Sequence, residues 1–249
     1  MKIIFEIYYH TRWGESLFLS GDIDELGANE DNRAVMMDYQ GDGLWKYTME
    51  LPASAKKFHY EYLVKSGEGI RREWGSPHSF SPGRNAGEYR LVDRWRDVPA
   101  DLPFYSSAFI QGIFFRQHAD SVVETIEPGT LTVKVDASQL RPDERLVMVG
   151  DCPELGDWDV LKAPLLNDSS FPEWQITLDG RQLKFPFEYK FVIVRTHQRE
   201  VVAWETGENR ICREKPQNPS EAVVVSGLRF NGSESQWRGA RTAIPVFSL

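Results

Sequence analysis

The sequence ESLFLSGDIDELG at residues 15–27 returns in altered form as ERLVMVGDCPELG at residues 144–156. In both stretches an apolar run is followed by Gly-Asp and, after two further residues, by Glu-Leu-Gly. An apolar run of this length that stops at such a glycine is typical of a β-strand followed by a turn. The offset of 129 residues is much longer than the ~20–50 residues of a short structural repeat. It therefore predicts duplication of a whole domain.

The similarity extends along both halves of the chain. Residues of the first half match residues of the second in the same order, Gly21 with Gly150, Trp45 with Trp174, Tyr62 with Tyr189 and Trp74 with Trp204. Short runs such as 131–135 and 185–193 alternate apolar with polar residues, and turn clusters such as 40–43 separate them. Helical patterns are nearly absent. The sequence thus predicts an all-β chain of two immunoglobulin-like antiparallel β-sandwich domains in tandem.

The domain boundaries follow from this alignment. We expect the first sandwich at residues 1–98, a connecting segment at 99–128, the second sandwich at 129–230 and a tail at 231–249. The connecting segment includes an apolar run at 108–115 that is too hydrophobic for a flexible tether. We expect this run to pack on a domain surface and to fix the relative orientation of the domains.

Composition excludes some partners and favours others. The net charge is −8, the pI is near 5.3, and Lys and Arg form no dense run. We therefore expect binding neither to nucleic acid nor to an anionic membrane, since both need a positive surface. Aromatic residues make up 12% of the chain, including eight Trp, and polar neighbours such as those of Trp13 indicate that some rings are exposed. Exposed rings usually mark a contact surface.

The sequence predicts no metal, no cofactor and no catalytic residue in this chain. The five histidines are scattered without metal-ligand spacing, and no dinucleotide, Walker or nucleophile-elbow motif occurs. Glu6 interrupts the apolar N-terminus and no stretch approaches the length of a membrane span, so we expect a cytoplasmic protein. Cys152 and Cys212 could form a disulfide, although two thiols in such a protein are better explained as reduced residues.

Three motifs of the second half carry a family resemblance. LGDW at 155–158, FEYKF at 187–191 and WETGEN at 204–209 resemble, in order and spacing, the first glucan site of the family-20 starch-binding modules. The match covers about one hundred residues per half and is looser in the first half. The resemblance implies a β-sandwich that binds α-1,4-glucans and has no catalytic role.

The resemblance also implies which residues bind. Trp158 and Trp204 would form an angled platform that matches the curvature of amylose. Lys190, Glu205 and Asn209 would supply a donor, an acceptor and an amide to the sugar hydroxyls. A glucose ring needs both kinds of partner, because it has a face of C–H groups and a rim of hydroxyls.

The first half departs from the family at this site. Asn29 replaces the first Trp, Leu63 stands where Lys is expected, and Gly75 replaces the Glu, so that only Trp74 remains. We expect this site to be lost or degraded in the first half.

The family's second site shows the opposite distribution. Trp13 occupies the position of its first Tyr, Tyr39 lies near the second, and Trp45 is close by. In the second half the first of these positions is Pro142. We therefore expect the two halves to be complementary, each keeping one site.

The tail carries a second resemblance. WRGARTAIPVFSL at 237–249 is similar to the opening of the catalytic barrel in 4-α-glucanotransferases of the amylomaltase kind, in which two such modules precede the barrel. Arg241 departs from the usual Trp-Arg-Gly-Ala-Gly. This resemblance implies that the chain is the glucan-docking part of a larger transferase whose catalytic carboxylates lie beyond it.

Structural explanations remain open for several of these residues. A Trp in a β-sandwich is more often part of the core than of a binding surface, which applies most to Trp45 and Trp174. Lys190 could be a solvated strand residue. For the chain as a whole, the alternative is a structural or dimerisation module that binds no glucan and forms a homodimer through residues 108–115.

Overall fold

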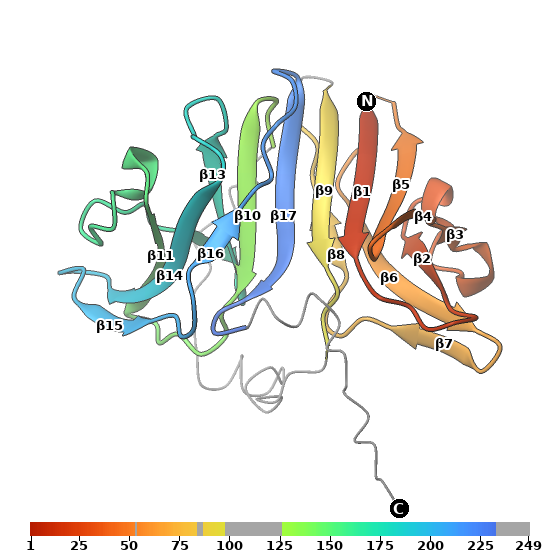
Figure 1. Cartoon of the computed structure of the whole chain (residues 1–249), viewed down its shortest axis with the longest axis horizontal. Helices are drawn as coiled ribbons and strands as arrows, with labels where there is room; N and C mark the ends of the chain where they lie inside the picture. Colours follow the sequence, from red (N-terminus) through yellow and green to blue (C-terminus); the bar gives the residue numbers. More distant parts are fainter. Residues whose placement is uncertain (53, 84–86, 98–125, 233–249) are drawn as a thin grey trace, which may run out of the picture.

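The computed structural model describes residues 1–52, 54–83, 87–97 and 126–232 (Figure 1). Almost every regular element is a β-strand, so the all-β prediction is confirmed. The tail from residue 233 and most of the predicted connecting segment, including its apolar run at 108–115, lie outside the described residues. Within the described ranges, no helix has both the length and the hydropathy to cross a membrane.

Strands of the first half form a sandwich of two layers, which we call the N-terminal sandwich. Side by side, its first layer contains β4 (Asp38–Gly41), β5 (Leu44–Glu50), β1 (Lys2–Tyr8) and β9 (Glu88–Arg94). Its second layer contains β2 (Ser16–Gly21), β3 (Val35–Met36), β6 (Phe58–Ser66), β7 (Gly69–Arg72) and β8 (His78–Phe80). Alternate side chains point between the layers, where Phe5, Tyr62 and Leu91 are fully buried.

Strands of the second half form the C-terminal sandwich. Its first layer contains β12 (Asn167–Ser170), β13 (Glu173–Asp179), β10 (Thr130–Asp136) and β17 (Glu221–Arg229). Its second layer, the outer sheet, contains β11 (Glu144–Gly150), β14 (Phe187–Arg195), β15 (Val201–Trp204) and β16 (Arg210–Cys212). Leu146, Trp174 and Phe191 are fully buried between the layers.

The first layers of the two sandwiches form one continuous sheet. β9 and β17 pair in parallel, from Glu88 opposite Glu221 to Val92 opposite Val225. The result is an eight-stranded sheet that runs across the centre of the molecule (Figure 1). β1 with β9 and β10 with β17 are also parallel, whereas the other strand pairs of the described residues are antiparallel, as the sequence predicts. Alternation shows which residues face a core but not which distant strand lies alongside.

Two tryptophans at similar positions lie in the two cores. Trp45 is 5% exposed and its Nε1–H donates to the carbonyl oxygen of Tyr9 at 3.0 Å. Trp174 is 0% exposed and donates in the same way to Ala137 at 3.1 Å. These bonds remove the cost of burying the indole N–H. Both residues therefore have the packing role that was the alternative to glucan contact.

Both cysteines are free and buried in the C-terminal core. Burial raises the pKa of Cys152 to about 11 and the pKa of Cys212 to about 12. Both thiols are therefore protonated at neutral pH, which makes them poor nucleophiles.

Candidate functional site

One face of the outer sheet is turned away from the C-terminal core. Residues of β11 and β14 alternate between its two faces. Met148 and Phe191 belong to the core, whereas Val149 and Val192 belong to a separate apolar cluster on the opposite face, which we call the outer face. Trp158 is half-buried and packs against this cluster. The outer face thus has an apolar floor next to an aromatic side chain.

The turn that places Trp158 depends on glycine and on left-handed backbone. Gly156 has a φ of 81°, followed by Asp157 at 50° and Trp158 at 65°, values that are uncommon for residues with a side chain. The N–H of Trp158 fixes the turn by donating to the carbonyl oxygen of Gly150 at 2.7 Å. A Cβ on Gly150 would lie 2.5 Å from the Glu188 carbonyl oxygen, so this close approach requires glycine.

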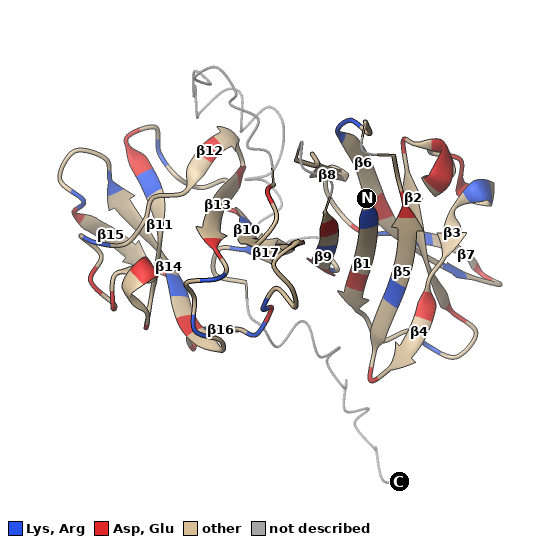
Figure 2. Ribbon diagram, turned by 90° about the horizontal axis from the view of Figure 1, so that it is seen from above, with Lys and Arg blue, Asp and Glu red and all other residues tan. Residues whose placement is uncertain are grey.

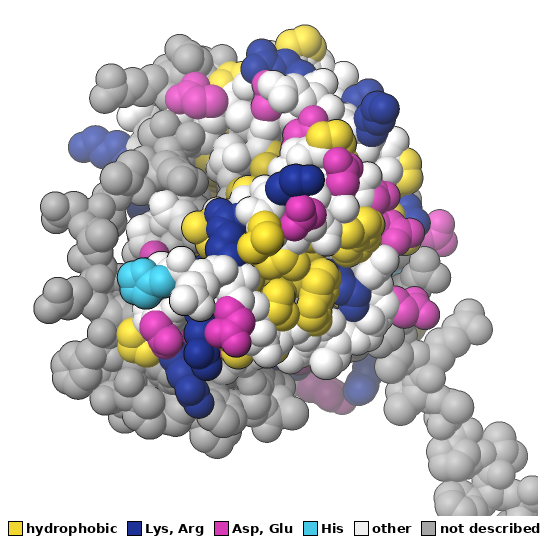
Figure 3. All heavy atoms as spheres, turned by 90° about the vertical axis from the view of Figure 1, so that its left-hand side faces the viewer, with side chains coloured by type: hydrophobic (Ala, Val, Ile, Leu, Met, Phe, Trp, Pro, Cys, Tyr) yellow, Lys and Arg dark blue, Asp and Glu magenta, His cyan; other side chains and the backbone are white. Residues whose placement is uncertain are grey.

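Trp204 ends β15 on the same face. It lies directly opposite Val192, and paired residues of antiparallel strands point to the same side of a sheet. Trp204 is 43% exposed, and Val202 on the same strand is as exposed. Figure 3 looks onto this end of the molecule and shows hydrophobic side chains gathered in one patch. The sheet therefore presents two tryptophans on one solvent-facing surface.

Lys190 also lies on the outer face, opposite Val149. Its ammonium group donates to the carbonyl oxygens of Glu205 at 3.1 Å and Gly207 at 2.6 Å. Lys190 thereby holds the segment after Trp204 against the sheet. These bonds use two of the three N–H donors of the ammonium, so one can reach a ligand.

Asn209 and Glu188 form a polar pair beside Lys190. Asn209 is exposed and its Nδ2 donates to Glu188 Oε2 at 2.8 Å. Glu188 precedes Lys190 by two residues on β14 and so shares its face. Glu188 lies beyond the predicted set of site residues, and its spacing of two from Lys190 is the sequence signal that identifies it.

Glu205 points into the protein instead. It is 4% exposed, and Arg210 Nε donates to both of its carboxylate oxygens at 3.0 Å. The backbone N–H groups of Phe191 and Asn231 donate to the same carboxylate at 3.3 and 3.2 Å. Alternation along the strand turns Glu205 to the side opposite Trp204. Its carboxylate therefore holds the site segment in place, which does not agree with the predicted direct contact to sugar hydroxyls.

The N-terminal sandwich has other residues at the corresponding positions. Gly21 opposite Tyr60 corresponds to Gly150 opposite Tyr189 at the ends of the paired strands. Counted from these pairs, Asn29, Glu61 and Arg72 stand where the C-terminal sandwich has Trp158, Lys190 and Trp204. The Asn29 turn is also the same, since its N–H donates to Gly21 at 2.7 Å and its φ is 62°.

The alignment that we predicted from the sequence is wrong in this region. It paired Leu63 with Lys190, Gly75 with Glu205 and Trp74 with Trp204. The structure pairs Glu73 with Glu205, because the Glu73 carboxylate accepts the N–H of Tyr62 at 3.1 Å as Glu205 accepts that of Phe191. A shift of two residues keeps every side chain on its face of the sheet, so the alternation pattern does not reveal it.

The second layer of the N-terminal sandwich, which we call the N-terminal outer sheet, has Arg72 at the Trp204 position, and the turn beside it has Asn29 at the Trp158 position. Arg72 forms ion pairs with Glu61 and Asp31, and Lys65 donates to the carbonyl oxygen of Asp31. Acidic and basic residues are interspersed over both sandwiches (Figure 2). In the N-terminal sandwich the ion pairs of Arg72 occupy the surface that corresponds to Trp204.

Trp13 is fully exposed in the turn before β2. The turn is closed by the N–H of Glu15, which donates to the carbonyl oxygen of Arg12 at 3.0 Å, and by the N–H of Arg12, which donates to Glu15 Oε2 at 2.8 Å. The C-terminal sandwich has the same turn at residues 141–144, with Pro142 at the Trp13 position. The structure thus places Trp13 and Pro142 at equivalent points.

Tyr39 is 57% exposed on the edge strand β4. Its ring centroid lies 5.1 Å from that of Trp45, and its hydroxyl accepts the N–H of Gly43 at 3.2 Å. The N–H of Tyr9 donates to the carbonyl oxygen of Gly43 at 2.7 Å. The β4–β5 turn therefore contacts the loop that leads to Trp13, and the buried Trp45 supports Tyr39 from below.

Trp74 lies where the sandwiches meet. The Arg229 guanidinium carbon from β17 lies 5.8 Å from its ring centroid. The backbone N–H of Trp74 donates to the carbonyl oxygen of Arg96 at 2.8 Å. The half-buried ring of Trp74 thus packs between the halves of the chain.

The chain is similar to known carbohydrate-active proteins. It is 28% identical over 272 aligned residues to the 4-alpha-glucanotransferase DPE2 of rice, Oryza sativa subsp. japonica, which covers 100% of this chain and 28% of the rice protein. It is 32% identical over 73 residues to the AA13 family lytic polysaccharide monooxygenase A of Aspergillus terreus, which covers 28% of this chain and 18% of that protein. The chain spans less than a third of the length of either relative.

A solved structure and a family profile extend this similarity. The family 20 carbohydrate-binding module of the maltotetraose-forming amylase from Pseudomonas saccharophila is 20% identical, with a TM-score of 0.32 over 38% of this chain and 98% of that module. The profile of the starch-binding domain CBM20 matches residues 1–85 and 130–223, which are most of the chain. The chain therefore belongs to the CBM20 family of starch-binding domains.

Proposed function

We propose that this chain binds α-1,4-glucans through the outer face of its C-terminal sandwich. The observation that carries the proposal is that Trp158, Lys190 and Trp204 share one exposed face. Sugar C–H faces would cover the indole rings, which gains the free energy of removing apolar surface from water. An isolated shallow site of this kind binds at about −4 to −6 kcal/mol, equivalent to dissociation constants from millimolar to tens of micromolar.

The polar groups of this site would orient the sugar. The remaining N–H donor of Lys190 and the amide and carboxylate of the Asn209–Glu188 pair lie on the face of the tryptophans. They match the donors and acceptors of a hydroxyl rim. Glu205 has a positioning role, because it fixes the segment that Lys190 holds.

A second proposed site lies on the N-terminal sandwich. Trp13 is exposed in a turn and Tyr39 on the adjoining edge strand β4, with Trp45 beneath Tyr39 as a support. Trp74 packs at the joint, so we do not propose it as a direct contact. Each sandwich would then keep the site that the other has lost.

The larger protein is part of the same proposal. We propose that the sandwiches are duplicated domains, at 1–98 and 129–230, of a cytoplasmic 4-α-glucanotransferase of the amylomaltase type. The alignment of the rice 4-alpha-glucanotransferase DPE2 with the whole chain supports this. In this protein the chain would dock the substrate beside the barrel rather than react with it.

Affinity electrophoresis in amylopectin tests the C-terminal site. Trp204→Ala should remove most of the retardation of a Trp13→Ala chain, in which only this site remains. Ile70→Ala is the matched control, since Ile70 is 47% exposed on β7 of the other sandwich and its loss should change nothing. Unchanged mobility of the Trp204 variant would contradict the assigned role. No retardation of any variant, with light scattering that reports a dimer, would favour the dimerisation module instead.

A further inference from the structure

At the joint between the two sandwiches, each half contributes side chains to the hydrophobic core of the other half. Ala222 and Val224 of β17 belong to the N-terminal core, and Val92 of β9 belongs to the C-terminal core. Val223, next to these residues on β17, faces the C-terminal core. The two cores therefore lie on opposite faces of the shared sheet, and each contains side chains from the other half.

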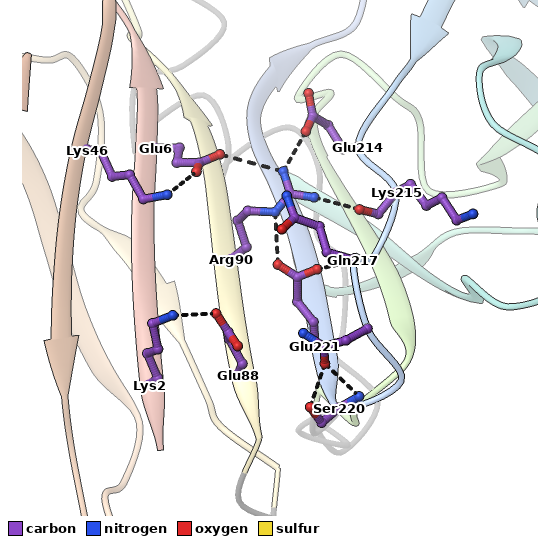
Figure 4. A network of polar contacts seen from close by, with 11 residues as sticks. Lys2, Glu6, Lys46, Glu88, Arg90, Glu214, Lys215, Gln217, Ser220 and Glu221 are labelled. Atoms are coloured by element: carbon purple, nitrogen blue, oxygen red, sulfur yellow. Dashed lines mark hydrogen bonds and ion pairs between the residues drawn. The ribbon is translucent and has the colours of Figure 1, made fainter. Parts of the chain in front are cut away.

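A buried arginine links the halves at one end of this joint (Figure 4). Arg90 on β9 is 6% exposed, and its Nε donates to Glu221 at 3.0 Å. Its other nitrogens donate to Glu214 at 2.7 Å and to the carbonyl oxygen of Lys215 at 2.8 Å. All three partners come from the second half. Separating the halves would remove all three of these hydrogen bonds, leave Arg90 only its 3.5 Å ion pair with Glu6, and take the guanidinium away from the buried Glu221 carboxylate, which is unfavourable.

A second buried network links the halves further along the same strands. Asp93 on β9 is 0% exposed and accepts the hydroxyls of Tyr60 at 2.8 Å and Tyr62 at 2.6 Å. The fourth member, Ser226 on β17, donates to Asp93 at 2.5 Å and lies 2.9 Å from His78 Nδ1. A hydroxyl from the C-terminal half thus completes a polar cluster of the N-terminal half. The joint is specified by polar geometry as well as by packing.

We propose that the two sandwiches form one rigid cooperative unit that bridges two segments of a long or branched α-glucan. The inference rests on the proposed function for its ligand. The outer sheet with Trp204 and the edge strand with Tyr39 lie at opposite ends of the long axis (Figure 1). A joint without a hinge cannot bring the two sites together. A single short oligosaccharide molecule can therefore occupy only one of them. A glucan that reaches both gains from the high effective concentration at the second site.

Calorimetry and hydrogen exchange of the whole chain test the rigid unit without any ligand. A single unfolding transition is expected, with the slowest amides of β9 and β17 exchanging as slowly as those of β1 and β10. Two resolved transitions, or rapid exchange confined to β9 and β17, would overturn the rigid unit. This result is independent of glucan binding.

Ligand titration then tests the bridging. The unmodified chain should bind amylopectin at least tenfold more tightly than the Trp13→Ala or the Trp204→Ala variant, whereas maltoheptaose should bind each remaining site with unchanged affinity. Equal binding of amylopectin by the unmodified chain and the better variant would overturn bridging. If a chain with both substitutions still binds maltoheptaose as the unmodified chain does, the proposed sites themselves are contradicted.

Discussion

Arg72 of the N-terminal sandwich occupies the sheet position that Trp204 occupies in the C-terminal sandwich. Arg72 lies opposite Leu63 on β6, and Trp204 lies opposite Val192 at the corresponding point of β14. One residue further along, Glu73 and Glu205 are both buried carboxylates. The two sheets therefore share a scaffold and differ in the side chains on its outward face. One face carries ion pairs, and the other carries two tryptophans.

Replacing Asn29, Glu61 and Arg72 should create a third glucan site on the N-terminal sandwich. In the variant Asn29→Trp/Glu61→Lys/Arg72→Trp, the N-terminal outer sheet would carry the residues of its counterpart. Trp should be tolerated at position 29, because Trp158 adopts almost the same φ, 65° against 62°. Isothermal titration with maltoheptaose should report one more site per chain than the unmodified protein. A folded variant with unchanged stoichiometry would show that these three positions do not suffice.

Loss of the Glu205–Arg210 ion pair should lower the free energy of unfolding of the protein. Glu205→Gln leaves the buried Arg210 without its partner charge, which typically costs about 3–5 kcal/mol in the free energy of unfolding. Urea unfolding followed by tryptophan fluorescence measures this loss. Glu208→Gln is the control, since Glu208 is exposed in the same segment and should change stability by less than about 0.5 kcal/mol. Equal stability of the two variants would contradict the assigned role of Glu205.

Acid should weaken the N-terminal sandwich through Glu73. Burial alone would raise the pKa of this carboxyl, but His78 and Arg96 outweigh burial and lower its pKa to about 2. A carboxyl with a depressed pKa in the folded state stabilises the fold above its ordinary pKa, and this contribution disappears as the pH falls towards the folded value. The window therefore runs from about pH 4.5 down to about pH 2, and the contribution is about 3 kcal/mol.

The stability difference between the unmodified chain and Glu73→Gln isolates this effect. It should be largest above pH 4.5 and shrink as the pH is lowered, as measured by denaturant unfolding at several pH values. A difference that stays constant down to pH 2.5 would show that Glu73 does not carry the acid sensitivity.

The sequence is sufficient to predict the elements but not the joint. Alternation and turn clusters identify the strands, because the period of two follows directly from strand geometry. The parallel pairing of β9 with β17 joins residues more than one hundred positions apart. No local pattern specifies such a pairing, and the Arg90 and Asp93 networks that stabilise it involve residues that read as ordinary charged strand positions.

The site could be predicted in part for a similar reason. Trp158, Lys190 and Trp204 lie in motifs whose spacing carries the resemblance, and the structure brings them to one face. The motif predicts Glu205 beside them, yet Glu205 directly follows Trp204, the last residue of β15, and turns inward. Glu188 is the opposite case: it lies in the FEYKF motif and shares the face of Lys190, but the resemblance does not include it among the site residues. The face to which a side chain points, rather than its residue type, decides whether it can reach a ligand at the surface or holds the segment in place from inside the protein.

Indole nuclear magnetic resonance during titration with maltoheptaose tests the central claim most directly. With the indole Nε1–H signals assigned through single Trp→Phe variants, the signals of Trp158 and Trp204 should shift progressively up to millimolar ligand, while the signal of the buried Trp174 stays in place. If maltoheptaose leaves the Trp158 and Trp204 signals unmoved while the protein is folded, the outer face is not a glucan-binding surface.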